Sequence, residues 1–190
     1  MVKLNKIYTR TGDGGSAGLV DGSRVSKSSL RMAAIGEVDE ANAAIGVALA
    51  ALGGADPSKH LLRIQNDLFD LGADVATPGE IDGALRIVAS QVERLEQEID
   101  AMNADLAPLT SFILPSGSAA VSALHLARAL VRRAERAAVA LNESEPLNPQ
   151  LLAYLNRLSD HLFVAARFVA VRDGGDVLWQ PGATRPDQNI

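Results

Sequence analysis

The chain has 190 residues, which is enough for one domain with a sizeable hydrophobic core. Apolar residues make up 47% and aromatic residues only 4%, a balance that favours packed helices over a β-sandwich. The net charge of −5 argues against a general affinity for nucleic acid or membrane lipid, and the absence of cysteine excludes disulfides, thiolate metal sites and a cysteine nucleophile. Neither a secretory signal nor an apolar run near the ~20 residues of a membrane span is visible, so we expect a cytoplasmic protein.

Residues 1–26 are rich in glycine and precede any helical pattern, so we expect them to be irregular. A first helix is expected to start near Ser26 to Ser29, where serines can cap it, and to run to about Leu52. Four further helices are expected over residues 58–76, 87–104, 118–141 and 150–171, followed by an irregular tail over 173–190. Helices joined by short loops predict a single all-α domain, a five-helix antiparallel bundle of the up-and-down type spanning residues 27–172.

The segment 6–16, Lys-Ile-Tyr-Thr-Arg-Thr-Gly-Asp-Gly-Gly-Ser, combines glycines, hydroxyls and one cation. Glycine lets the backbone approach a ligand closely, and free N–H groups, hydroxyls and a cation suit a polyphosphate. It is not a Walker A loop, because no Lys-Ser or Lys-Thr follows a second glycine at the required spacing. The segment alone allows two interpretations, a nucleotide-binding loop or a flexible arm.

The fourth helix carries a charged stripe, with Arg128, Arg132 and Glu135 on one face and Arg136 beside them. Two arginines one turn apart repel each other unless an anion lies between them, and guanidinium groups suit phosphate oxygens. The stripe is therefore either a triphosphate clamp or a solvated helix face. The expected core face of this helix consists of Ala123, Leu126, Ala127, Leu130, Val131, Ala134, Ala137, Ala138 and Leu141.

The fifth helix has a mixed stripe of Asn156, Asp160, Phe163 and Arg167, set apart from its apolar core face. Phe163 in this stripe either contacts a flat apolar ligand or partner subunit, or packs against a neighbouring helix.

The sequence leaves the roles of three further features open. In the loop over residues 109–117, Phe112 either folds into the core or projects into a pocket. Asp67 and Asp70 are expected on a helix surface or interface. The histidines His60, His125 and His161 are scattered and lack the Glu-x-x-His spacing of ferritin-like di-metal sites, so no metal ligands are assigned.

Five blocks of the chain, taken in order, resemble the PduO-type ATP:cob(I)alamin adenosyltransferases, also called corrinoid adenosyltransferases. The resemblance covers roughly residues 3–172 and departs from the family pattern at Gly14, Ala17, Gly18 and Ile35. The blocks are residues 6–13 (KIYTRTGD), 23–27 (SRVSK), 36–42 (GEVDEAN), 112–136 (starting FILPSG, with LHLAR and RRAER) and 154–160 (YLNRLSD).

The resemblance implies a cobalamin adenosyltransferase-like homotrimer of bundles with ATP bound at the subunit interfaces. It implies a salt bridge between Asp39 and Arg128 across the interface, Phe112 against the lower face of the corrin ring, and Phe163 as the apolar wall of the same pocket. Asp39, Phe112, Arg128 and Arg132 are its catalytic residues by this similarity. The ATP-binding residues that it implies are Thr9, Arg10, Thr11, Gly12, Asp13, Gly15, Lys27, Arg132, Glu135, Arg136 and Asn156.

The activity implied is transfer of the 5′-deoxyadenosyl group of ATP to cob(I)alamin, with Mg²⁺ helping to neutralise the triphosphate. A reductase and an adenosylcobalamin-dependent enzyme are then possible partners. Two alternatives stay open: a cobalamin carrier or nucleotide sensor that binds without turnover, and a purely structural oligomer.

Overall fold

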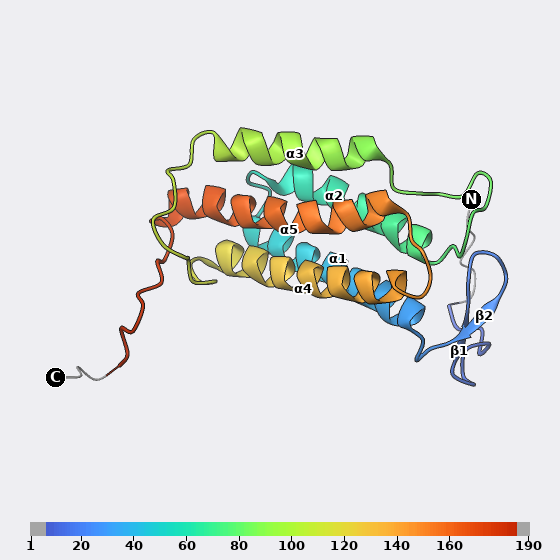
Figure 1. Ribbon diagram of the computed structural model, residues 1–190. Coiled ribbons are helices and arrows are strands. Elements are labelled where there is room, and N and C mark those ends of the chain that lie inside the picture. The colour runs from blue at the N-terminus through green and yellow to red at the C-terminus, as the bar shows by residue number, and fades with distance from the viewer. Residues whose placement is uncertain (1–6, 186–190) are drawn as a thin grey trace.

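The computed structural model describes residues 7–185, so Lys6 and the outermost parts of the segments 1–26 and 173–190 lie outside it. The expected all-α five-helix bundle is confirmed, and the long helices lie side by side along one direction (Figure 1). The helices are α1 (Leu30–Leu52), α2 (Ser58–Val75), α3 (Ala89–Asn103), α4 (Ala119–Asn142) and α5 (Pro149–Ala170), followed by a 3₁₀ turn over Val171–Asp173.

The helix ends follow from local capping chemistry. Ser29 Oγ accepts a hydrogen bond from the Met32 backbone N–H (3.3 Å), and Ser118 Oγ accepts one from Val121 (3.4 Å), so that each serine satisfies a free amide of the first turn. Gly53 ends α1 in the left-handed region with φ of 59°, which an L side chain rarely adopts.

The core lies where α1 packs against α4 and α2, and where α5 packs against α4 and α3. It contains many small alanines beside large leucines, and the alanines allow the helices to approach closely. Leu126, which we expected in the core face of α4, is 54% exposed, because the buried face of the helix extends the other way, to Val121 and His125. Among residues 7–185 no helix is both long enough and apolar enough to cross a lipid bilayer.

Asp67 and Asp74 on α2 are buried, and of the two positions expected for Asp67, a helix surface or an interface, the structure has the interface. The Asp74 carboxylate accepts hydrogen bonds from Arg86 Nη1 (2.6 Å), the Ile87 backbone N–H (2.9 Å) and Asn148 Nδ2 (2.8 Å). The segment before α3 and the start of α5 are thereby fixed to α2.

The Asp67 carboxylate accepts bonds from Gln91 Nε2 and the Tyr154 hydroxyl, both at 2.9 Å, and from Arg94. Burial, and then the Asp67 charge, raise the pKa of Tyr154 far above its usual value, so the phenol stays a donor. These bonds hold the largely polar helix α3 against the bundle.

We expected the N-terminal segment to be irregular, but β1 (Ser16–Gly18) and β2 (Arg24–Ser26) pair as an antiparallel hairpin. A hydrogen bond of 3.1 Å from the Val20 backbone N–H to the Ala76 carbonyl anchors it to the end of α2. The hairpin lies at the end of the bundle where α1 begins, and the tail leaves from the opposite end (Figure 1).

Candidate functional site

The glycine-rich loop over residues 9–15 folds back on Lys27. The Lys27 backbone N–H donates to the Gly15 carbonyl (2.8 Å), and a Cβ added to Gly12 would lie only 3.1 Å from Lys27 Nζ. Gly15 has φ of 80°, whereas a Cβ at Gly14 would meet nothing within 4 Å. Gly15 is therefore required by its backbone conformation, a side chain at Gly12 would only displace the flexible end of Lys27, and Gly14 is not required by either.

Hydroxyl groups and one arginine shape the outer side of the loop. Thr9 Oγ1 and Thr11 Oγ1 lie 2.9 Å apart, and Arg10 between them has φ of 61°, a strained conformation for a residue with a side chain. Arg24 Nη2 donates to the Thr11 carbonyl (2.7 Å), so Arg24, to which we gave no role from the sequence, fixes the loop to the hairpin. Asp13 is exposed at the turn.

On α4, Arg128, Arg132 and Arg136 form no ion pair with any carboxylate among residues 7–185. Arg128 Nε is buried without a hydrogen-bond partner, and burial, followed by the charge of Arg132, lowers the pKa of Arg128. By contrast, Arg133 on the same helix pairs with two glutamates of α1. The other arginines in ion pairs are Arg31, Arg63, Arg86, Arg94, Arg157 and Arg167.

Glu135 and Asn156 join this row of cations to α5. Asn156 Nδ2 donates to Glu135 Oε1 at 2.8 Å, which orients both side chains. Because a helix rises about 1.5 Å per residue, Arg128, Arg132 and Glu135 extend over about 10 Å of α4. The surface so formed has several cationic donors without carboxylate partners and one oriented amide, which is the chemistry that binds a polyphosphate.

In the loop before α4, Phe112 is 77% exposed, which excludes the position in the core that the sequence left open for it. Its loop is held by the C-terminal tail: the Trp179 backbone N–H donates to the Phe112 carbonyl, and the Leu114 N–H donates to the Val177 carbonyl, both at 2.8 Å. The rings of Phe112 and Trp179 lie 6.1 Å apart. No local pattern in the sequence signals this pairing, which joins residues far apart in the chain.

Phe163 is half-buried against α4, with its ring 6.4 Å from that of His125 in an edge-to-face arrangement. Burial, and then the charge of Arg128, lower the pKa of His125, so its ring is neutral at pH 7. Arg167, which we expected on the same polar stripe, is buried instead. Its Nε donates to Asp176 Oδ2 at 2.9 Å and fixes the start of the tail.

A single chain does not bring all the expected groups together. Asp39 is exposed on α1, and no ion pair joins it to Arg128 within the described part of the chain. No hydrogen bond or ion pair among residues 7–185 links the loop 9–15 to α4 or α5. The loop 9–15 lies at the hairpin end of the bundle, and the segment that leads into α4 lies at the opposite end (Figure 1).

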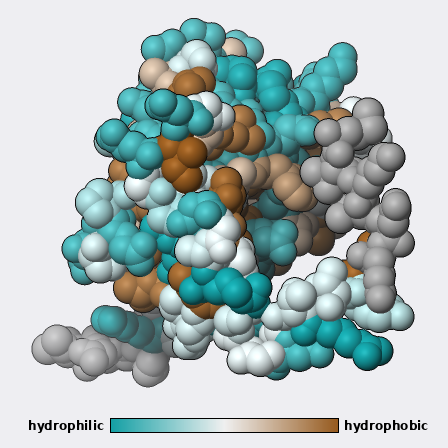
Figure 2. Space-filling view, turned by 90° about the vertical axis from the view of Figure 1, so that its right-hand side faces the viewer, coloured by the Kyte–Doolittle hydropathy of each residue, from teal (hydrophilic) through white to brown (hydrophobic). Residues whose placement is uncertain are grey.

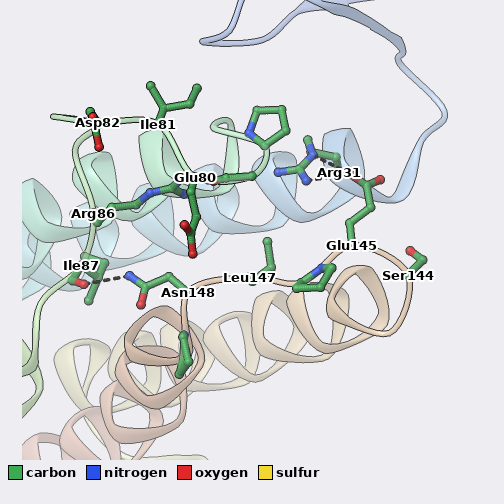
Figure 3. Close-up of a pocket in the computed structure, with 14 residues that line it drawn as sticks. Arg31, Glu80, Ile81, Asp82, Arg86, Ile87, Ser144, Glu145, Leu147 and Asn148 are labelled. Carbon is green, nitrogen blue, oxygen red and sulfur yellow. Dashed lines mark hydrogen bonds and ion pairs between the residues drawn. The ribbon is translucent and has the colours of Figure 1, made fainter.

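A cavity of about 760 Å³ opens at the hairpin end, between the segment 78–87 and the loop between α4 and α5. Figure 2 looks onto this end and shows hydrophobic residues among hydrophilic ones around a hollow. Its cations already have partners, since Arg31 pairs with Glu145 (2.6 Å; Figure 3) and Arg86 pairs with Asp74, which is buried behind the cavity lining. The cavity therefore offers no free cation to a triphosphate, and it contains none of the expected ATP residues.

The sequence suggested that the histidines are scattered, but His60 and His161 both lie beside Glu98 of α3. Their separation of about a hundred residues along the chain hid this contact.

Comparison with known proteins agrees with this geometry. A family described as cobalamin adenosyltransferase matches residues 7–169. The chain is 52% identical over 191 residues to the corrinoid adenosyltransferase of Mycobacterium tuberculosis (97% of each chain) and 48% identical over 183 residues to that of Bacillus subtilis (94% of each chain).

Among solved structures, the chain is similar to an F112A variant, in that protein's own numbering, of a PduO-type ATP:corrinoid adenosyltransferase from Lactobacillus reuteri complexed with cobalamin and ATP. The TM-score is 0.86 at 36% identity, covering 92% of this chain and 99% of the other. The family match over most of the chain and the agreement of the whole fold show that this protein belongs to the cobalamin adenosyltransferase family.

Proposed function

We propose that this protein transfers the 5′-deoxyadenosyl group of ATP to the cobalt of cob(I)alamin, giving adenosylcobalamin and triphosphate. The observation that carries the proposal is the row of arginines on α4 that have no carboxylate partner, beside the oriented Glu135–Asn156 pair. Elsewhere on the bundle most arginines are neutralised by carboxylates, so this row is reserved for an external anion.

The chemistry requires positioning more than proton transfer. The cobalt(I) centre of the substrate donates an electron pair to the 5′ carbon of ATP, the cobalt–carbon bond forms, and the carbon–oxygen bond breaks. Triphosphate leaves with the electron pair of the broken carbon–oxygen bond. Arg132, Arg136 and Lys27 stabilise the negative charge that develops on the triphosphate, while Asn156 and Glu135 orient the nucleotide. No protein nucleophile is needed, which agrees with a chain that has no cysteine.

Phe112 takes the lower face of the corrin ring in this proposal. An exposed aromatic ring on a loop fixed by the tail can lie against that face and displace the lower nucleotide ligand. The resulting four-coordinate cob(II)alamin is easier to reduce to cob(I)alamin. Phe163, half-buried beside His125, supplies the apolar wall of the same pocket.

The site is completed by a second copy of the chain, and we propose a homotrimer. Asp39 of one copy pairs with Arg128 of the next, and the loop 9–15 of one copy covers the α4 surface of another. The exposed apolar residues Val47 on α1 (58%) and Leu126 on α4 (54%) support contact through these helices. Sedimentation equilibrium is expected to give three times the chain mass of 19.9 kDa.

Mg²⁺ fits this site as an ion bound mainly by phosphate. No cage of three acidic or histidine ligands is found beside the arginines of α4 in the described part of the chain, and Glu135 is the carboxylate placed to contribute. Mg²⁺ commonly uses one or two carboxylates with water and substrate phosphates, and it would neutralise part of the triphosphate charge. ATP and strong reductants are available in the cytoplasm, so we place the protein there. Its partners in this proposal are a reductase that produces cob(I)alamin and an enzyme that uses adenosylcobalamin.

The test is to mix the protein with ATP, Mg²⁺ and chemically reduced cobalamin and to follow the corrinoid absorption spectrum. Formation of adenosylcobalamin is the expected result. Binding of both substrates by calorimetry without product would favour a cobalamin carrier or nucleotide sensor. Failure to bind ATP at millimolar concentration would leave only a structural role.

A further inference from the structure

Two histidines and one glutamate from three different helices converge on the side of the bundle formed by α2, α3 and α5. One donor atom from each of His60, Glu98 and His161 lies within 4.8 Å of the other two. Glu98 Oε2 is 3.0 Å from His161 Nε2 and 3.5 Å from His60 Nδ1. With metal–ligand bonds of about 2.0–2.2 Å, neighbouring ligands of a tetrahedral ion lie about 3.3 Å apart, which these two distances bracket.

One ring nitrogen of the cluster lacks a hydrogen-bond partner. His60 Nδ1 is buried without a hydrogen bond, although it lies beside the Glu98 carboxylate. The His161 side chain is fully buried, whereas the His60 side chain is 34% exposed and gives access from solvent. A cation among these three atoms would satisfy the orphaned nitrogen, which nothing else among residues 7–185 does.

The three side chains are of a type that ligates a metal. A neutral imidazole donates a ring-nitrogen lone pair to a metal ion, and an ionised carboxylate donates an oxygen lone pair. Arg63 binds Glu98 Oε1 and leaves Oε2 facing the histidines. Hydrogen bonds of this kind orient the carboxylates that bind metal ions in proteins.

We propose that His60, Glu98 and His161 bind one divalent transition-metal ion of the zinc class. Two imidazoles and one carboxylate suit Zn²⁺ and similar ions, whereas Mg²⁺ prefers oxygen ligands. The ion fastens α2 and α5 to α3. It is separate from the Mg²⁺ that accompanies ATP, and the proposal does not depend on the transferase activity.

The test uses the untagged full-length chain, stripped with a chelator and titrated with Zn²⁺ by calorimetry. We expect one Zn²⁺ per chain. At a free Zn²⁺ concentration of about 100 times Kd, we expect Tm to rise by roughly 5–10 °C. Mg²⁺ at the same concentration is expected to leave Tm unchanged. An equal rise with Mg²⁺ would contradict selection by nitrogen ligands.

His60→Ala is the deciding variant, because the half-exposed His60 can be truncated without opening the core. We expect it to weaken Zn²⁺ binding at least tenfold, with the matched control His125→Ala binding Zn²⁺ like the unmodified chain, since the chain has 3 histidines and His125 lies outside the cluster. Absence of Zn²⁺ binding, or unchanged binding in His60→Ala, would overturn the proposal. Glu98→Gln gives a second check by removing the carboxylate charge.

Discussion

Arg132 and Arg133 are neighbours on α4, yet we predict that replacing each by alanine has opposite consequences. Arg132 has no carboxylate partner among the described residues and lies one turn from Arg128. Like charges at this spacing destabilise a helix by about 0.2–0.5 kcal/mol. Arg132→Ala is therefore expected to leave the free energy of unfolding unchanged or to raise it by that amount.

The same substitution removes a donor from the proposed triphosphate site. Loss of one preorganised donor to a developing negative charge costs about 10²–10³ in rate, or about 2.7–4 kcal/mol. We expect kcat/KM for ATP to fall by that factor in Arg132→Ala. Initial rates of adenosylcobalamin formation at varied ATP and saturating cob(I)alamin measure it, and urea unfolding at fixed protein concentration measures stability.

Arg133→Ala is the matched control. Arg133 pairs with Glu37 and Glu40 of α1, both partly exposed, so its loss is expected to cost about 1 kcal/mol of stability and to leave kcat/KM for ATP within about twofold. If Arg132→Ala instead lost stability like Arg133→Ala and kept its activity, the arginine row on α4 would be an ordinary solvated helix face and the phosphate-site argument would fail.

Three further predictions concern the core, the corrinoid end and pH. Asp74→Asn breaks the ion pair between the buried Asp74 and the partly exposed Arg86 and is expected to cost about 3 kcal/mol in urea unfolding, whereas Asp70→Asn on the same helix stays within about 0.5 kcal/mol; equal effects would contradict the role of Asp74. Phe112→Ala is expected to keep Tm and the rate from preformed cob(I)alamin but to lower turnover from cob(II)alamin by about tenfold or more, and intact turnover would exclude its role against the corrin ring. Because burial and a neighbouring arginine hold the pKa of His125 below its usual value, its contribution to stability is complete above about pH 6.5 and is lost as pH falls below that value. His125→Gln is therefore expected to unfold with a weaker pH dependence between pH 7 and 5, and an unchanged slope would count against this explanation.

The sequence predicted the helices well because their signals are local. Serine caps, helix breaks at glycine and proline, and apolar spacing along each helix place the element ends near Leu30, Leu52, Ala119 and Asn142. The phosphate-binding character of the loop 9–15 and of α4 is also local, since it depends on residue types at fixed spacing.

Predictions failed where a side chain's surroundings come from distant parts of the chain. Arg167 meets Asp176 of the tail, and His60 meets His161, and no local pattern reports such contacts. For Asp67 the sequence left a helix surface and an interface open, and only its contact with Tyr154 of α5 decided for the interface. Helical periodicity gives the direction of a side chain from its own helix, but not what the neighbouring helix offers it. Burial of Asp67 and Arg167 is stable only because those partners are present.

The sequence by itself therefore determined the helices, the glycine-rich loop and the kinds of residue available for binding a nucleotide. The tertiary structure decided which charges are neutralised and which are left for a ligand. Arg133 is paired with α1, while Arg128 and Arg132 are not, although all three look alike in the sequence. The physical reason is that a charged side chain is neutralised only by an opposite charge within a few ångströms, and the packing of the helices decides which side chains come that close.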